Sequence, residues 1–261
     1  MMRVFIGFIF NLQFFLSFLL ILTPPVQPLF GTGRTSLQTD ALTLVFDEPL
    51  RSVAEQVADS YPGLRQDLEK IFRWSLDFRP TVVLIKDSQQ FQHIAGTDLI
   101  VAFAAPQRNQ VVIDFSKMST TPFNLETTLK HELCHLLLHR YIGREKLPKW
   151  LDEGVSQWAS DGVAEVIMDY KRAILPQAIS SGRYFKMRSL SESFPKDRGS
   201  LQLAYAQSKS FVDYISREFG KTSLLNLLDS LKNGLSIEAA VAESLSIPFD
   251  ELEKGGWTIS K

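Results

Sequence analysis

The residues whose types and spacing could carry chemistry lie in the stretch HELCH, residues 131–135. It supplies His131, Glu132 and His135. On an α-helix each residue advances by about 100°, so two imidazoles four positions apart lie on one face and can reach one metal ion. Glu132 lies about 100° round from His131, where its carboxylate can act as a base on a nearby water molecule. The stretch therefore predicts a zinc hydrolase site.

A catalytic zinc ion needs a third protein ligand and one open position. The metzincin pattern would place Gly and His three and six residues after the second His, but Leu138 and Tyr141 occupy those positions. A separate cysteine ligand is excluded because the single cysteine, Cys134, lies inside the motif. The remaining candidate is Glu153 in KWLDEGVSQWAS, 18 residues after His135.

Two helices must position these side chains. The stretch LETTLKHELCHLLLHR, residues 125–140, has leucines at helical spacing, and either residues 121–122 (Thr-Pro) or Asn124 can start the helix. A second helix is expected from about Trp150, after a loop that contains a glycine and a proline. The alternative is a core helix whose two histidines are simply hydrogen-bonded.

The motif HELCH followed by LPKWLDEG resembles the gluzincin metallopeptidases, specifically their small peptidase-MA-like branch, over roughly residues 80–257. The resemblance implies an α+β, zincin-like metallopeptidase fold, with a small N-terminal mixed sheet and helices followed by a mainly helical C-terminal part. It also implies one Zn²⁺ per chain, held by His131, His135 and Glu153. Gln157 stands where some gluzincins carry an Asp that orients a ligand histidine, so the partner of these histidines stays open.

The same resemblance implies peptide-bond hydrolysis with Glu132 as the general base. It also implies that a tyrosine faces the scissile carbonyl, and Tyr205 in AYAQSKSFVDYI is the candidate, against the alternative of a packed core tyrosine. Tyr184 and Tyr141 are weaker alternatives. Related aminopeptidases hold the substrate amine with a Gly-x-Met-Glu-Asn-type segment, which does not occur between residues 95 and 130. This favours an endopeptidase.

Residues 41–120 are predicted to form an N-terminal α/β subdomain. By the resemblance, residues 101–105 form an edge strand that pairs with an extended peptide substrate, while an ordinary edge strand is the alternative. The patterns predict a helix over 48–74, with a break at residues 62–63 (Pro-Gly) as an alternative, and a short helix capped by Asp87 or Ser88. Strands are predicted at 41–46, 81–85, 99–104 and 110–115, the last two joined as a hairpin.

Residues 121–261 are predicted to form a helical subdomain that carries the zinc site. The stretch 162–179 is expected to form one helix, with a break at Pro176 as an alternative. Residues 182–199 are expected to form a loop, and 201–220 a helix ended by Gly220. Two short helices and a final docked segment follow.

The other two histidines and the cysteine have simpler predictions. His93 has polar neighbours and is expected at the surface. His139 lies about 12 Å along the helix axis from His131, which is too far for both to bind one ion easily. We expect His139 to lie at the rim of the site or to have a structural role. Cys134 lies among leucines and is expected to be a small buried residue.

Composition limits the partners. The chain has 261 residues, 45% of them hydrophobic and 22% charged, which suits an ordinary globular protein of one or two domains. The net charge of −1 gives no excess of basic residues for binding phosphates, so we expect no nucleic-acid partner. The expected partner is a peptide or protein substrate. A single cysteine excludes a disulfide within the chain.

Residues 1–22 are predicted to be a signal peptide or an N-terminal membrane anchor, because positions 4–22 contain only three polar residues. Residues 23–40, rich in proline and glycine, are predicted to be a linker or processing region. The remainder would be exported, to the cell envelope or outside the cell, and an uncleaved segment would make the membrane a partner.

Two other functions compete with the peptidase. The first is a membrane-tethered binding or scaffold module on an inactive peptidase-like fold, which metal analysis would separate from the enzyme. The second is a di-iron helical bundle that uses Glu132 and His135. It is excluded because no other His has Glu three residues before it.

Overall fold

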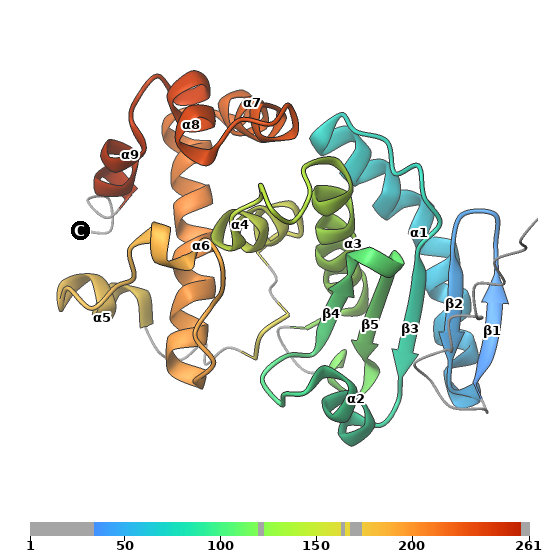
Figure 1. Cartoon of the computed structure of the whole chain (residues 1–261). Helices are drawn as coiled ribbons and strands as arrows, with labels where there is room; N and C mark the ends of the chain where they lie inside the picture. Colours follow the sequence, from blue (N-terminus) through green and yellow to red (C-terminus); the bar gives the residue numbers. More distant parts are fainter. Residues whose placement is uncertain (1–33, 120–122, 163–164, 168–173, 257–261) are drawn as a thin grey trace, which may run out of the picture. The chain divides into compact units, whose positions relative to one another are not determined.

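The computed structural model describes residues 34–119, 123–162, 165–167 and 174–256, all of which belong to one compact unit, Gly33–Lys261 (Figure 1). The segment predicted as a signal or anchor, 1–22, lies outside the described residues. The strands are β1 (Thr35–Gln38), β2 (Thr43–Phe46), β3 (Thr81–Ile85), β4 (Ala102–Ala105) and β5 (Gln110–Asp114). The helices are α1 (Arg51–Phe72), α2 (Ser88–Ala95), α3 (Leu125–Tyr141), α4 (Lys149–Ala159), α5 (Ile174–Ser180), α6 (Arg198–Glu218), α7 (Lys221–Lys232), α8 (Ile237–Leu245) and α9 (Phe249–Gly256).

The five strands form one mixed sheet in the order β1-β2-β3-β5-β4. The central pairs β2–β3 and β3–β5 are parallel, and the outer pairs β1–β2 and β4–β5 are antiparallel. Strand β3 reads TVVLI and is buried over its last four residues, as expected for a central strand covered on both faces. Strand β1 lies within the stretch that the sequence assigned to a linker.

Strand β4 is an outer strand of the sheet, and it forms the predicted hairpin with β5. Ala102 pairs with Ile113 and Ala105 with Gln110. The turn between them is a short 3-10 helix, Pro106–Arg108, closed by Asn109 in the left-handed conformation with φ of 48°. The stretch predicted to bind substrate, residues 101–105, therefore lies at a sheet edge.

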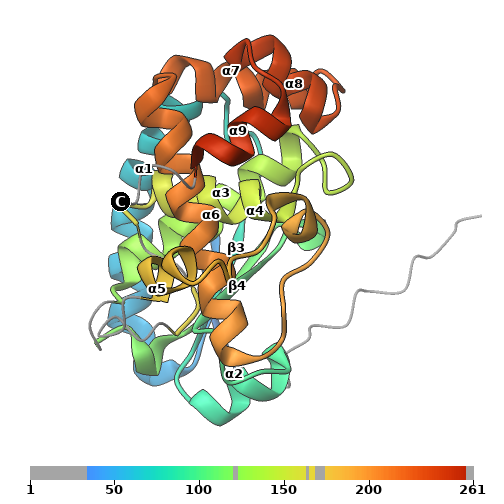
Figure 2. The same ribbon diagram turned by 90° about the vertical axis from the view of Figure 1, so that its left-hand side faces the viewer.

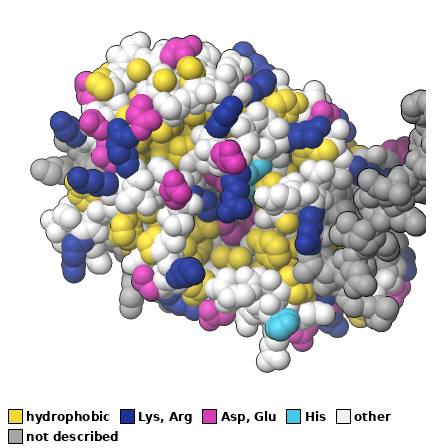
Figure 3. Space-filling model, viewed as in Figure 1, with side chains coloured by type: hydrophobic (Ala, Val, Ile, Leu, Met, Phe, Trp, Pro, Cys, Tyr) yellow, Lys and Arg dark blue, Asp and Glu magenta, His cyan; other side chains and the backbone are white. Residues whose placement is uncertain are grey.

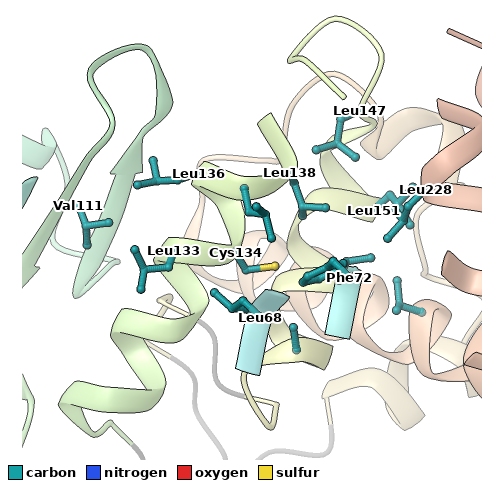
Figure 4. Close-up of a cluster of buried hydrophobic side chains, with 14 of the residues drawn as sticks. Leu68, Phe72, Val111, Leu133, Cys134, Leu136, Leu138, Leu147, Leu151 and Leu228 are labelled. Carbon is teal, nitrogen blue, oxygen red and sulfur yellow. The ribbon is translucent and has the colours of Figure 1, made fainter. Parts of the chain in front are cut away.

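The helix that carries HELCH is the centre of the core. Every residue of α3 from Thr128 to Leu138 is buried, so this helix is covered all round rather than on one apolar stripe. Figure 4 shows its leucines among side chains of the sheet and of other helices, including Val111 of β5, Phe72 of α1 and Leu228 of α7. Burial on all sides fixes the direction of both histidines.

The helical part is built on α6. Figures 1 and 2 show this long helix with α4, α5 and α9 packed against it and with α7 and α8 near its C-terminal end. Helices α4 and α6 approach closely at Gly154, where an added Cβ would lie 2.4 Å from the Ser208 carbonyl oxygen and 2.6 Å from Val212 Cγ2. Glycine is therefore required at this position of the WLDEG motif for steric reasons.

The fold has the predicted α+β class, with a small mixed sheet followed by a mainly helical part. The helix predicted over 162–179 was wrong. Val166 forms an antiparallel bridge with Ile100, so the stretch is not one helix, and its described helical part is α5, Ile174–Ser180. The α1 helix also continues through Pro62 instead of breaking there.

Among the described residues, no helix combines the length and apolar content that a membrane span needs.

Candidate metal centre

Helix α3 presents the two histidines of HELCH to each other. Its first residue follows Asn124, whose side chain accepts a hydrogen bond from the Thr127 N–H at 3.0 Å, so Asn124 is the cap; the alternative cap at 121–122 lies outside the described residues. The His131 and His135 rings meet edge to face, and their Nε2 atoms lie 3.1 Å apart. Both side chains are buried.

Helix α4 brings the predicted third carboxylate to the same place. The Glu153 Oε2 atom lies 3.5 Å from Nε2 of His135 and 3.8 Å from Nε2 of His131. Ligand atoms that lie about 2.0–2.1 Å from a tetrahedral zinc ion are about 3.3 Å from one another. The separations observed here therefore suit one zinc ion between the three groups. The Glu153 Oε2 atom is buried and makes no hydrogen bond, which fits a group meant to bind a cation.

Asp152 is the histidine partner that the sequence did not identify. Its Oδ1 lies 2.6 Å from Nδ1 of His135, and its Oδ2 lies 2.9 Å from Nε2 of His139. A carboxylate on Nδ1 fixes the tautomer that leaves Nε2 free to bind metal. Gln157 instead donates to the backbone oxygens of Glu153 and Tyr205, so it links α4 to α6.

Sequence reasoning missed a fourth group, Glu165. This side chain is buried, and its Oε2 lies 2.7 Å from Nε2 of His131. Ligand atoms of His131, His135, Glu153 and Glu165 all lie within 4.8 Å of one another. Glu165 lies in the described segment 165–167, and no sequence motif marks it as a metal ligand.

Glu132 and Tyr205 lie around this cluster. Both carboxylate oxygens of Glu132 are buried without a hydrogen-bond partner, while its side chain lines the cavity beside the cluster. The Tyr205 hydroxyl donates to Glu165 Oε1 in a short hydrogen bond and to Glu153 Oε1 at 3.4 Å. The other tyrosines that the sequence offered lie elsewhere: Tyr184 is 37% exposed, and Tyr141 stacks on Trp74.

A cavity of about 420 Å³ opens onto the cluster. Its wall includes Phe103 and Ala104 of β4, so the sheet edge borders the candidate site. Figure 3 shows acidic, basic and apolar side chains gathered around a hollow on this face. The remaining lining residues are Pro106, Gln107, Glu132, His135, His139, Arg144, Lys149, Asp152, Glu153, Glu165, Glu192, Ser193 and Phe194.

Burial and nearby charges shift the pKa values of His131, Glu132 and Glu153. Burial alone would lower the pKa of His131, but the carboxylates of Glu165 and Glu153 offset it and raise this pKa to about 9. Burial raises the pKa of Glu132 to about 8, helped by the charge of Glu165. Burial would raise the pKa of Glu153, but Lys149 and the histidines hold it well below its usual value.

These shifts belong to the metal-free protein, in which protonated imidazoles and the Lys149 ammonium balance the buried carboxylates. Three buried carboxylates, Glu132, Glu153 and Glu165, meet around two imidazoles, and the Lys149 ammonium pairs with Glu153 at the cavity wall. A divalent cation would balance this charge and allow both imidazoles to bind in their neutral form. The donor set of imidazole nitrogen and carboxylate oxygen is one that zinc accepts.

Comparison with known protein families found a match over residues 86–259 to the peptidase MA superfamily. The chain belongs to the peptidase MA superfamily. Its peptidase MA fold is similar to that of yeast LTA4 hydrolase in its native form, with a TM-score of 0.56 and 12% identity over 87% of this chain. The complex of that enzyme with bestatin gives a TM-score of 0.52 at 13% identity over 87% of this chain.

The chain spans 38% of the length of those two structures. An M1 zinc metallopeptidase from Deinococcus radiodurans is less similar, with a TM-score of 0.43 and 13% identity over 85% of this chain and 50% of its own. A comparison with curated sequences found no significant match. The fold is thus that of zincin-like metallopeptidases, and the cluster is of the kind that holds a metal ion.

Proposed function

We propose that this member of the peptidase MA superfamily is a zinc-dependent endopeptidase. The observation that carries the proposal is the convergence of two imidazole Nε2 atoms and the Glu153 carboxylate at 3.1–3.8 Å from one another, beside a carboxylate with no partner. His131, His135 and Glu153 are the proposed ligands of one Zn²⁺ per chain. When bound, zinc would supply a Lewis acid and lower the pKa of water towards neutrality.

Residues of the chain would supply the general base and the oxyanion donor. Glu132, beside the ligands and without a hydrogen-bond partner, accepts the proton of the attacking water and returns it to the leaving amine. Without metal, burial raises the pKa of Glu132 to about 8, and a bound divalent cation would lower it and favour the carboxylate that can accept a proton. Tyr205 donates its hydroxyl proton as a hydrogen bond to the oxyanion of the tetrahedral intermediate.

The sheet edge supplies a docking place for the substrate. Strand β4 borders the cavity through Phe103 and Ala104, and an extended peptide can pair with the edge of this strand. Pairing through the backbone holds a peptide regardless of its side chains. Cleavage of internal bonds is consistent with the absence of a Gly-x-Met-Glu-Asn-type segment in residues 95–130.

Metal analysis and two variants test the proposal. The purified protein should hold about one zinc per chain and cleave peptides whose N-terminus is acetylated. Glu132→Gln should keep the zinc and lose nearly all turnover, whereas Glu153→Ala should lose the zinc. The matched control is Glu126→Gln, because Glu126 lies exposed on the same helix and should keep both properties.

Three results would each contradict part of this proposal. Activity retained in Glu132→Gln removes Glu132 from the role of general base. Full zinc occupancy in Glu153→Ala places the third ligand elsewhere. A protein that binds no zinc and cleaves no peptide would favour a binding or scaffold module on this fold.

We also propose that residues 1–22 direct export and either anchor the protein or are removed. Fractionation of cells that produce the full chain, compared with a chain lacking these residues, tests this placement. Recovery of both forms in the same compartment would refute it.

A further inference from the structure

The carboxylate of Glu165 has no role in the mechanism above, yet it lies at the ligand cluster. Its Oε2 is 2.7 Å from Nε2 of His131, and its side chain is buried. A zinc site with three protein ligands keeps one open position, and a site with four protein ligands is closed. Two neutral imidazoles and two carboxylates would fill a tetrahedron and neutralise a divalent cation.

Glu165 reaches the cluster by strand pairing. The Val101 N–H donates to the backbone oxygen of Glu165 at 2.8 Å, and the Ile167 N–H donates to the backbone oxygen of Leu99 at 2.8 Å. Val166 forms the antiparallel bridge with Ile100. The segment 165–167 thus pairs with the chain immediately before β4, the strand whose edge we assign to the substrate.

Two contacts hold the segment from the side of α6. The Gln202 side-chain amide donates to the backbone oxygen of Ile167 at 2.7 Å, and Val166 packs against Tyr205 in a small apolar cluster. The Tyr205 hydroxyl, the proposed oxyanion donor, is hydrogen-bonded to Glu165. In this arrangement one side chain occupies a ligand position and also engages the hydroxyl that the reaction needs.

We propose that Glu165 is a fourth, displaceable metal ligand that closes the site. The segment 165–167 holds this carboxylate in place because its backbone pairs with residues 99–101, immediately before β4. The second half of this inference rests on the proposed function, because a peptide that pairs with β4 and extends past Ala102 must replace the segment. Its docking would withdraw Glu165, open the coordination position and release the Tyr205 hydroxyl.

The test uses Glu165→Gln in the full chain, with two measurements that move in opposite directions. Zinc affinity, measured by competition with a chromophoric chelator, should fall at least about 10-fold, since even loss of a partner of a ligand costs about 10–100-fold. The affinity of the Co²⁺-loaded protein for acetohydroxamate, followed by visible absorption, should rise at least about 10-fold. The reason is that the Glu165 carboxylate no longer competes with acetohydroxamate for the fourth coordination position.

A matched control and a second variant sharpen the result. Glu192→Gln removes another carboxylate of the same cavity wall and should leave zinc affinity unchanged. Ile167→Pro removes the N–H donated to Leu99 but keeps the Glu165 side chain, so it should lower zinc affinity in the same direction. Circular dichroism of each variant checks that the fold is retained.

Each outcome decides a separate claim. Zinc and acetohydroxamate affinities that both equal those of the native protein would refute the fourth ligand. A fall in both affinities would show a structural role for Glu165 and refute displacement. Native zinc affinity in Ile167→Pro would refute placement by the strand segment. A native protein without zinc would instead refute the proposed peptidase function.

Discussion

Substitution of Gly154 by alanine tests how closely α4 must pack on α6 to position Glu153. The added Cβ would lie 2.4 Å from the Ser208 carbonyl oxygen, about 1 Å short of the 3.4 Å at which ordinary van der Waals contact begins. The same atom would lie 2.6 Å from Val212 Cγ2. Because the nearest atom belongs to the backbone of α6, a side-chain rotation cannot relieve the overlap. The two helices must separate.

The expected cost follows from this geometry. Overpacking in a core costs about 1–3 kcal/mol, and a backbone clash lies at the upper end of that range. For a chain of this size each kcal/mol corresponds to about 2–4 °C, so Gly154→Ala should lower the melting temperature by about 6–12 °C. Zinc affinity should fall as well, since a shift of about 1 Å at Glu153 exceeds the tolerance of about 0.2 Å in ligand distances.

The assay is thermal unfolding followed by circular dichroism, with zinc content measured on the same samples. Gly63→Ala is the matched control, because Gly63 lies in α1 with nothing within 4 Å of the added Cβ. Replacing a helical glycine with alanine gains about 0.5–1 kcal/mol, so this control should raise the melting temperature by about 1–4 °C. If Gly154→Ala melts at or above the native temperature, the close approach of α4 and α6 does not position the ligand.

Three further predictions follow from the charges of the cluster. Asp152→Asn should weaken zinc binding by about 10–100-fold in a chelator competition, because the amide no longer fixes the tautomer of His135. Unchanged zinc affinity would show that Asp152 does not orient His135. The metal-free protein should lose about 3 kcal/mol of unfolding free energy as pH rises from 6.5 to 9. The reason is that the folded state keeps a proton on His131 that the unfolded chain has already released. Urea titrations that show constant or rising stability over this range would contradict this prediction. Free zinc at about 1,000 times its dissociation constant should raise the free energy of unfolding by about 4 kcal/mol, and equal stability with zinc and with chelator would argue against binding to the folded state alone.

Much of the fold followed from local patterns. The apolar run TVVLI forms β3 over the predicted residues, Thr81–Ile85, because four adjacent large side chains need burial on both faces of a sheet. Asp87 caps α2, as the sequence allowed, through a hydrogen bond from the Gln90 N–H. His93 is exposed and Cys134 is buried, as predicted.

The sequence alone also determined the central pair of the site. Four-residue spacing on a helix places His131 and His135 on one face whatever the rest of the fold does, because helical geometry depends only on the local backbone. The motif spacing then suggested Glu153 as the carboxylate that joins them. Its position beside both imidazoles is a property of α4 packing on α3 and α6, which the glycine in WLDEG permits.

Only the tertiary structure decided which other side chains belong to the site. The sequence did not single out Asp152, because a helix position does not reveal which imidazole nitrogen a carboxylate will meet. Glu165 was placed in a predicted helix, but pairing of Val166 with Ile100 overrides that weak local preference and brings the carboxylate to His131. Contacts between residues 34 or 66 positions apart depend on how separate elements pack, and local periodicity carries no record of them.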